Sequence, residues 1–325
     1  LNGHKITSSN GSHTVSASRE GLVIKNGTIE NTASKTTYGA IYATFSTKGT
    51  HSLTLENVTV IAKNTGIYAV TSNGDATVTI GDKTVIEAET GIKVVGADTK
   101  ARTGTLTLNV SSGTVTGTKC GIHVTGPTNQ NEIAAVTVTI TGGEVSSMTI
   151  NSGSGKRGAN VAISGGTVTG DLKNAGKDVI TITDGTFKGA VTKLDTNGTI
   201  SISGGTFAIK PDTTYLVKGY TITENADNTY GVKKTTYVAE VSGTQYTSLQ
   251  AAIDKATEKA TVTLLADTRE NVTIRTNRLT LDLNGHTLNG GTEKGKPALT
   301  VTALNVTVKD SSEAKTGTIM REDTA

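Results

Sequence analysis

Two stretches of the sequence, ITITDGTF at 180–187 and ISISGGTF at 200–207, repeat one pattern about 20 residues apart. In each, aliphatic residues alternate with Thr or Ser over four positions, and a glycine-containing turn with an aromatic residue follows. Alternation with a period of two places the aliphatic side chains on one face of an extended strand and the hydroxyls on the other. Each stretch therefore predicts a half-buried β-strand followed by a sharp turn.

The pattern occurs five times along the chain, and a second strand family repeats in step with it. The glycines of the first family are Gly113, Gly143, Gly166, Gly185 and Gly205, with spacings of 30, 23, 19 and 20 residues. The second family lies at 40–43, 66–70, 91–95 and 121–124. Repeats of this length indicate a stacked architecture. Coils of roughly 20 to 30 residues, stacked about 4.8 Å apart through their strands, predict an all-β parallel β-helix, or solenoid.

Composition agrees with this fold and excludes several classes of partner. The 325 residues contain 3% aromatics and no Trp, which argues against an immunoglobulin-like sandwich. The 31 basic and 28 acidic residues are scattered, so nucleic acid is not an expected partner. No run of 18 apolar residues occurs, so we expect no membrane insertion. The single Cys120 and the lack of Cys/His metal spacing predict no disulfide, metal site or cofactor.

The repeats predict three segments. Residues 1–206 are expected to form a β-helix body, 207–236 a C-terminal cap or linker, and 237–325 the start of a second β-helix unit. In the last segment, apolar residues at 249, 252, 253 and 256 have helical spacing behind Thr247 and Ser248, which are suitable N-caps. The sequence therefore predicts one short amphipathic capping helix at 248–258.

A repeat of LNGH, at 1–4 and again at 283–286, relates the two ends of the chain. The runs that follow also correspond, VIK at 23–25 with VTVK at 306–309, and NGTI at 26–29 with TGTI at 316–319. We therefore expect the chain to start within one unit that lacks its capping helix and to end in the early, truncated coils of the next. Such a segment belongs to a tandem array with flanking β-helix units of the same polypeptide.

The run SLQAAID at 248–254 resembles the helix that opens pectin-lyase-like right-handed β-helices. Together with TLLAD at 263–267, LDLNGH at 281–286 and NADNTY at 225–230, it is similar to the repeated β-helix domains of large surface and secreted proteins from Gram-positive, often gut-dwelling, bacteria. This resemblance implies a right-handed parallel β-helix and an extracellular or cell-surface location. It transfers no catalytic residue, because the Asp and basic clusters of pectate lyases and polygalacturonases have no match here.

These observations favour a secreted or cell-surface, non-catalytic module that acts as an adhesin, stalk or display scaffold for a glycan, a host protein or a cell-wall protein. Its expected contact sites are the variable loops at 31–39, 125–132 and 152–160. Lys156 and Arg157 in the last loop are the candidate contacts for an anionic partner. No residue is assigned a catalytic role.

Two alternatives remain open. The first is a polysaccharide lyase or glycoside hydrolase, which needs paired carboxylates that neighbouring coils could supply. Single acids such as Glu56 and Asp282 are more simply surface charges, Asp82 is a turn residue, and His123 near Cys120 lacks an orienting partner. The second alternative is a bacterial surface protein that binds host immunoglobulin or a host receptor. Clustered acids beside Lys or Arg would favour the enzyme, and an exposed tyrosine or apolar patch would favour a binding protein.

Overall fold

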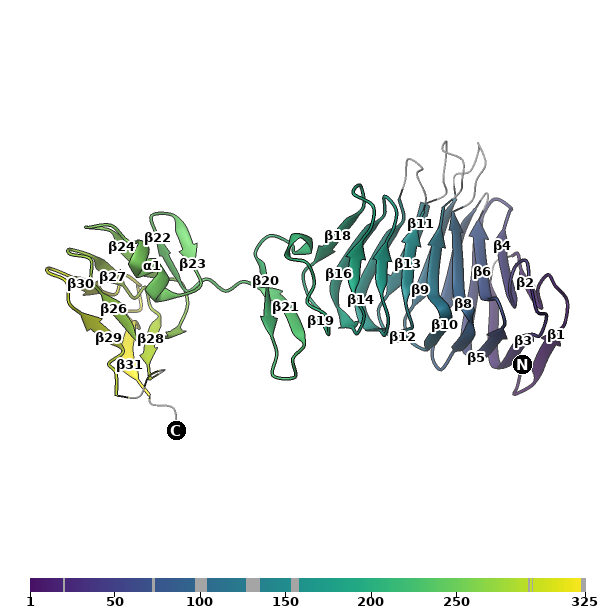
Figure 1. The fold of residues 1–325 in the computed structure, drawn as a ribbon, viewed down its shortest axis with the longest axis horizontal. Helices are drawn as coiled ribbons and strands as arrows, with labels where there is room; N and C mark the ends of the chain where they lie inside the picture. Colours follow the sequence, from purple (N-terminus) through teal and green to yellow (C-terminus); the bar gives the residue numbers. More distant parts are fainter. Residues whose placement is uncertain are drawn as a thin grey trace. The chain divides into compact units, whose positions relative to one another are not determined.

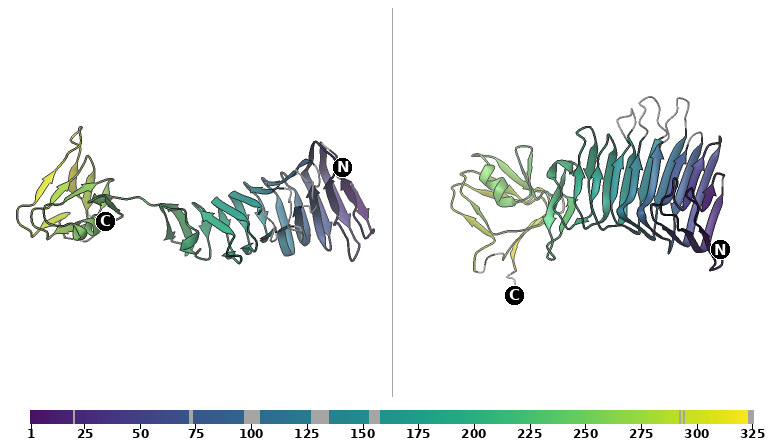
Figure 2. Two further views of the ribbon diagram at one scale, coloured as in Figure 1. Left: turned by 90° about the horizontal axis from the view of Figure 1, so that it is seen from above. Right: turned by 45° about the vertical axis from the view of Figure 1, so that its right-hand side comes forward.

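The computed structural model describes residues 1–19, 21–71, 74–96, 104–126, 135–152, 158–291, 293 and 295–322. Its contacts divide the chain into two compact units, Leu1–Lys234 and Thr235–Ala325. In the first unit the coils follow one another from the purple N-terminal end to the green C-terminal end (Figure 1), and two other views show the same succession (Figure 2). The predicted all-β parallel β-helix with one short helix is confirmed.

Parallel strands of the first unit form three ladders that run along the stack of coils, and long strands bend from one ladder into the next. Ladder 1 contains β7 (Asp75–Ile80), β9 (Thr105–Val110), β11 (Ala135–Ile140), β18 (Thr199–Ile202) and the first parts of β3 (Leu22–Asn31), β5 (Thr50–Ala62), β14 (Asn160–Val168) and β16 (Val179–Phe187). Ladder 2 contains β1 (Lys5–Ser8), β12 (Glu144–Val145), β19 (Thr206–Phe207), the last parts of β3, β5, β14 and β16, and the first parts of β8 (Val85–Gly96) and β10 (Thr114–Thr125). Ladder 3 contains β2 (Val15–Ala17), β4 (Ile41–Phe45), β6 (Thr65–Thr71), the last parts of β8 and β10, β13 (Met148–Asn151), β15 (Leu172–Asn174) and β17 (Val191–Lys193).

The alternating sequence pattern decides which side chains fill the coils. In β11 the side chains of Val136, Val138 and Ile140 are buried, while Thr137 and Thr139 between them face outward. The pairing of β9 with β11 is in register over six residues, so buried aliphatics stack on buried aliphatics. One continuous hydrophobic core therefore runs through the first unit, and the stacked rings of Phe187 and Phe207 fill it near its C-terminal end.

The predicted glycine turns lie where the chain passes from ladder 1 to ladder 2. All five repeat glycines have a positive φ, between 76° at Gly143 and 114° at Gly185, which other L-residues rarely adopt. A Cβ atom on Gly143 would lie 2.6 Å from the carbonyl oxygen of Gly113 in the preceding coil. The turn therefore needs glycine both for its backbone conformation and for the close approach of the next coil.

A β-hairpin ends the first unit. Its strands are β20 (Tyr220–Glu224) and β21 (Tyr230–Lys234), and the short 3₁₀ helix η1 (Thr213–Tyr215) precedes it. Strand β21 pairs antiparallel with β19, with Phe207 opposite Tyr230, and Leu216 bridges to Ile202 of β18. These contacts cover free strand edges of the last coil, and a covered edge cannot pair with another chain.

The second unit repeats the three-ladder plan over a smaller number of coils. Its elements are β22 (Ala239–Val241), β23 (Thr244–Tyr246), α1 (Leu249–Lys255), β24 (Thr261–Leu264), β25 (Thr268–Arg269), β26 (Val272–Ile274), β27 (Thr280–Asp282), β28 (Thr287–Gly290), β29 (Leu299–Val301), β30 (Thr307–Lys309) and β31 (Thr318–Arg321). Strands β24, β27 and β30 stack in parallel, as do β25, β28 and β31, and β26 pairs with β29.

Helix α1 is the predicted capping helix, but it is shorter than the expected range 248–258. Ser248 is its N-cap, and its hydroxyl accepts the N–H of Ala251 at 3.2 Å. The helix ends at Lys255 because Ala256 has an extended backbone, with ψ of 132°, and donates its N–H to Ile253. Leu249, Ala252 and Ile253 face the core of this unit.

The first turn of α1 is fixed by Glu270, which the sequence did not single out. Its carboxylate accepts hydrogen bonds from the N–H groups of Leu249 and Gln250 and from the hydroxyls of Ser248 and Thr268, at 2.8 to 3.1 Å. Burial disfavours the charged carboxylate, but these hydrogen bonds outweigh burial and hold the pKa of Glu270 below its usual value. An ionised Glu270 therefore stabilises the helix start.

The substitution Gly143→Ala is expected to lower the free energy of unfolding of the first unit by about 2–4 kcal/mol, since positive φ and the close carbonyl both penalise a Cβ. The control Gly219→Ala also places a Cβ at positive φ, but nothing lies within 4 Å of it, so it should cost about 1–2 kcal/mol. Urea unfolding followed by circular dichroism measures both. Equal losses would contradict the role assigned to coil contact.

The substitution Glu270→Gln should destabilise α1 by about 1–3 kcal/mol at pH 7, because charge-assisted hydrogen bonds become neutral ones. The pKa of Glu270 is lower in the folded chain, so this stabilisation is complete above the ordinary Glu pKa and declines as the pH falls below it. Hydrogen exchange of the α1 amides should thus differ between variant and parent at pH 7 and converge as the pH falls through the lowered pKa of Glu270. A pH-independent difference would refute the role of the charge.

Candidate functional site

The outward face of ladder 3 carries a row of aromatic and basic side chains. In register on successive strands lie Tyr42 of β4, Tyr68 of β6, Lys93 of β8 and His123 of β10. Tyr38, from the loop before β4, joins this row by packing on Tyr42. We call these five residues the Tyr–Lys–His stripe. Because adjacent strands are about 4.8 Å apart, the stripe forms a continuous band along the coil stack.

The three tyrosine rings pack directly on one another. The rings of Tyr38 and Tyr42 are stacked, with centroids 4.1 Å apart and planes inclined by 19°. Tyr68 meets both rings edge-on, at 5.7 and 5.8 Å. His13 from the preceding coil lies 5.6 Å from Tyr42. All four rings are only partly buried, so the cluster presents an aromatic surface to the solvent.

The basic end of the stripe consists of Lys93 and His123. The ammonium group of Lys93 lies over the ring of Tyr68, 5.3 Å from its centroid, in the geometry of a cation–π contact. Burial lowers the pKa of His123 below its usual value, and the positive charge of Lys93 lowers it further. His123 is therefore a neutral hydrogen-bonding group at pH 7, next to a charged lysine. Together, the stripe offers ring faces, one cation and one imidazole.

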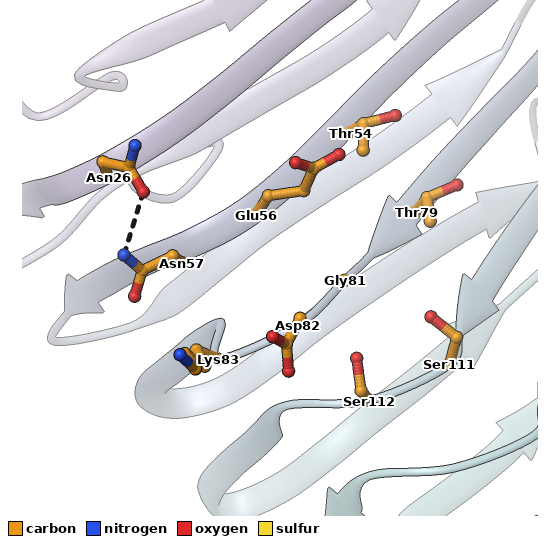
Figure 3. A pocket seen from close by; sticks show the side chains of 10 residues that line it. All are labelled: Asn26, Thr54, Glu56, Asn57, Thr79, Gly81, Asp82, Lys83, Ser111 and Ser112. Atoms are coloured by element: carbon orange, nitrogen blue, oxygen red, sulfur yellow. Dashed lines mark hydrogen bonds between the residues drawn. The ribbon is translucent and has the colours of Figure 1, made fainter. Parts of the chain in front are cut away.

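A second candidate site is a polar groove at the corner between ladders 1 and 2 (Figure 3). It has a volume of about 560 Å³. The side chains that line it come from successive coils and are Asn26, Thr54, Glu56, Asn57, Thr79, Asp82, Lys83, Ser111 and Ser112. The amide of Asn57 donates to Asn26 at 2.9 Å, and Glu56 forms an ion pair with Lys25 at 2.6 Å. The groove thus places two acids, Glu56 and Asp82, on neighbouring coils, although the sequence suggested only isolated surface and turn charges.

The segments predicted as partner contacts are only partly described by the structure. Lys156 and Arg157 lie outside the described residues, as does most of the loop 125–132. The loop 31–39 does contribute, since Tyr38 at its end completes the aromatic cluster. Cys120 is buried, and its thiol donates to the carbonyl of Ile122 at 3.1 Å, so it does not face His123 as a nucleophile would.

Within the described residues, no group of three or more His, Cys, Asp or Glu side chains is arranged to hold a metal ion. A search of those same residues for a helix long and apolar enough to cross a bilayer finds none.

The stripe was not predicted from the sequence, because the strands of ladder 3 were identified only from the aliphatic residues expected to be buried. The signal was present, since Tyr42, Tyr68, Lys93 and His123 each follow the Ile of their repeat. Aligning the repeats on that Ile places the four side chains in one outward column. The stripe meets the criterion set out above for a binding protein, namely a solvent-facing tyrosine patch.

The substitution Lys93→Gln should raise the pKa of His123, because it removes the nearby positive charge while burial persists. An NMR titration of the imidazole C–H signals measures the shift, with the parent chain as the reference. An unchanged His123 titration would show that Lys93 does not face the imidazole in solution.

No protein-family model matches the chain, and comparisons with curated proteins and with solved structures give no match. The similarity to β-helix domains of bacterial surface proteins therefore stays a prediction from sequence, and the geometry of the two sites carries the functional argument.

Proposed function

We propose that the chain is a non-catalytic, extracellular β-helix module that binds a glycan on the Tyr–Lys–His stripe and displays this stripe on a rigid rod. The observation that carries the proposal is the cluster of Tyr38, Tyr42 and Tyr68 on the outward face of ladder 3. The aliphatic face of a sugar ring stacks on aromatic side chains, and tyrosine adds a hydroxyl that can bond to the sugar.

The rigidity of the scaffold supports this role. Four of the five stripe residues lie on paired strands, the three tyrosine rings pack on one another, and Lys93 lies over the ring of Tyr68. Binding therefore orders few additional side chains, and less of the contact free energy is lost to conformational entropy. A surface of this kind suits an adhesin or display module, whose contacts must persist without any chemical step.

A second candidate function, glycan cleavage, is favoured by one observation, the presence of Glu56 and Asp82 in the same corner groove. Hydrolysis of a glycosidic bond uses two carboxylates with different roles. In this groove Glu56 is ion-paired with Lys25. Incubation with polysaccharides is expected to release no reducing ends and no unsaturated ends. Products that form with the parent chain but not with the variant Glu56→Gln would support glycan cleavage in place of glycan binding.

The glycan-binding proposal predicts that Tyr68→Thr weakens binding at least about tenfold, which corresponds to about 1.4 kcal/mol. Threonine occupies the same outward register at Thr149 and Thr192, so the substitution suits the strand. Binding is measured on an array of glycans and of host and cell-wall proteins, followed by calorimetry with the best ligand.

The matched control is Tyr237→Thr, which removes a solvent-exposed tyrosine of the second unit and should leave affinity unchanged. Binding to a host immunoglobulin or receptor without any glycan signal would support the protein-binding alternative instead. Full glycan affinity in the Tyr68→Thr variant would mean that the stripe is not the binding site.

A further inference from the structure

The described strand segments of ladder 3 carry basic side chains and no acidic ones, whereas ladders 1 and 2 carry both, as in the ion pairs Lys25–Glu56 and Lys5–Glu30. The outward register that contains the stripe continues along the stack, and its members from β4 to β15 are Tyr42, Tyr68, Lys93, His123, Thr149 and Lys173. In the parts of the described strands that pair within ladder 3, from β2 to β17, no position is Asp or Glu, since Glu87 and Glu89 of β8 precede its ladder 3 part at Thr90. Ladder 2 in contrast carries Glu30, Glu87 and Glu144. The face of ladder 3 is therefore basic and aromatic.

The charge of Lys93 is available to a ligand. Its ammonium group contacts the ring of Tyr68, and within the described part of the chain it has no carboxylate partner. Lys173 differs, because its ammonium group is paired with Asp171 at 3.0 Å. A cation held against an aromatic ring and lacking a counter-ion attracts an anionic group that approaches the same ring.

We propose that the ligand of the stripe is an acidic glycan, which lies along the coil stack with a sugar ring against Tyr42 and Tyr68 and its carboxylate or sulfate group on Lys93. This inference rests on the glycan-binding function proposed above. Lys93 is one strand step, about 4.8 Å, beyond Tyr68, so one sugar residue can reach both side chains. His123, one step further, offers its ring nitrogens to the next hydroxyl or anionic group.

The test compares acidic glycans with their neutral parents on the full chain. Polygalacturonate is paired with its methyl ester, and chondroitin sulfate with its desulfated, esterified form, so that the second member of each pair lacks the anionic groups of the first. The acidic member is expected to bind at least about tenfold more tightly at low salt in at least one pair, and this ratio should fall as salt is added. A response of the polygalacturonate pair identifies a carboxylate as sufficient, and a response of the chondroitin pair alone identifies the sulfate.

The variant Lys93→Gln should reduce the ratio between acidic and neutral members to near one, while Lys188→Gln, which removes an exposed lysine outside ladder 3, should leave it unchanged. Equal binding of both members, with the Tyr68→Thr loss intact, would overturn the acidic-glycan inference and leave the glycan-binding function standing. Absence of binding to every glycan would overturn both. If Lys93→Gln kept the full ratio of acidic to neutral glycan binding, another cation would be responsible for the preference for acidic glycans, and the role assigned to Lys93 would be wrong.

Discussion

The backbone hydrogen bonds between successive coils are the interaction on which the rest of this structure depends. A strand in each ladder must pair in register with the strand before it, so equivalent side chains of neighbouring coils lie about 4.8 Å apart. The register is kept although the repeat glycines are 19 to 30 residues apart. In ladder 1, for example, β9 pairs with β11 over six residues in the longer coils, and β14 pairs with β16 in the shorter ones. The segments that connect the ladders accommodate the differences in coil length, so the columns of side chains along each ladder stay continuous.

Both candidate sites follow from this constraint. Tyr42 and Tyr68 are 26 residues apart in sequence, and no local motif joins them, but strand pairing brings their rings into edge contact. The corner groove arises in the same way, from turns of successive coils that lie above one another. A β-helix therefore builds a site from one residue per coil, and exchanging a side chain in the column alters the site without disturbing the core.

The fold could be predicted from the sequence because its determinants are local and repeated. Alternation in strands such as β11, a positive φ at the repeat glycines and the cap at Ser248 each depend on a few neighbouring residues. The stripe depends instead on the relative register of different coils, which appears only when the repeats are aligned on the Ile of ladder 3. Tyr38 could not be placed by such an alignment, because it lies in a loop with its own length.

The glycan-binding role proposed for the Tyr–Lys–His stripe is compatible with the regular geometry of the scaffold. Pairing along ladder 3 fixes both the spacing and the direction of the outward column, and stacking of Tyr38 on Tyr42 limits the motion of both rings. A glycan chain is itself a linear series of similar units, so a site that advances by a constant step can contact several of them along one line. Each added contact then contributes to affinity without a further cost in lost translational freedom, since the chain is already bound. The arrangement of Tyr68, Lys93 and His123 on consecutive strands is the part of the molecule where this matching is most direct.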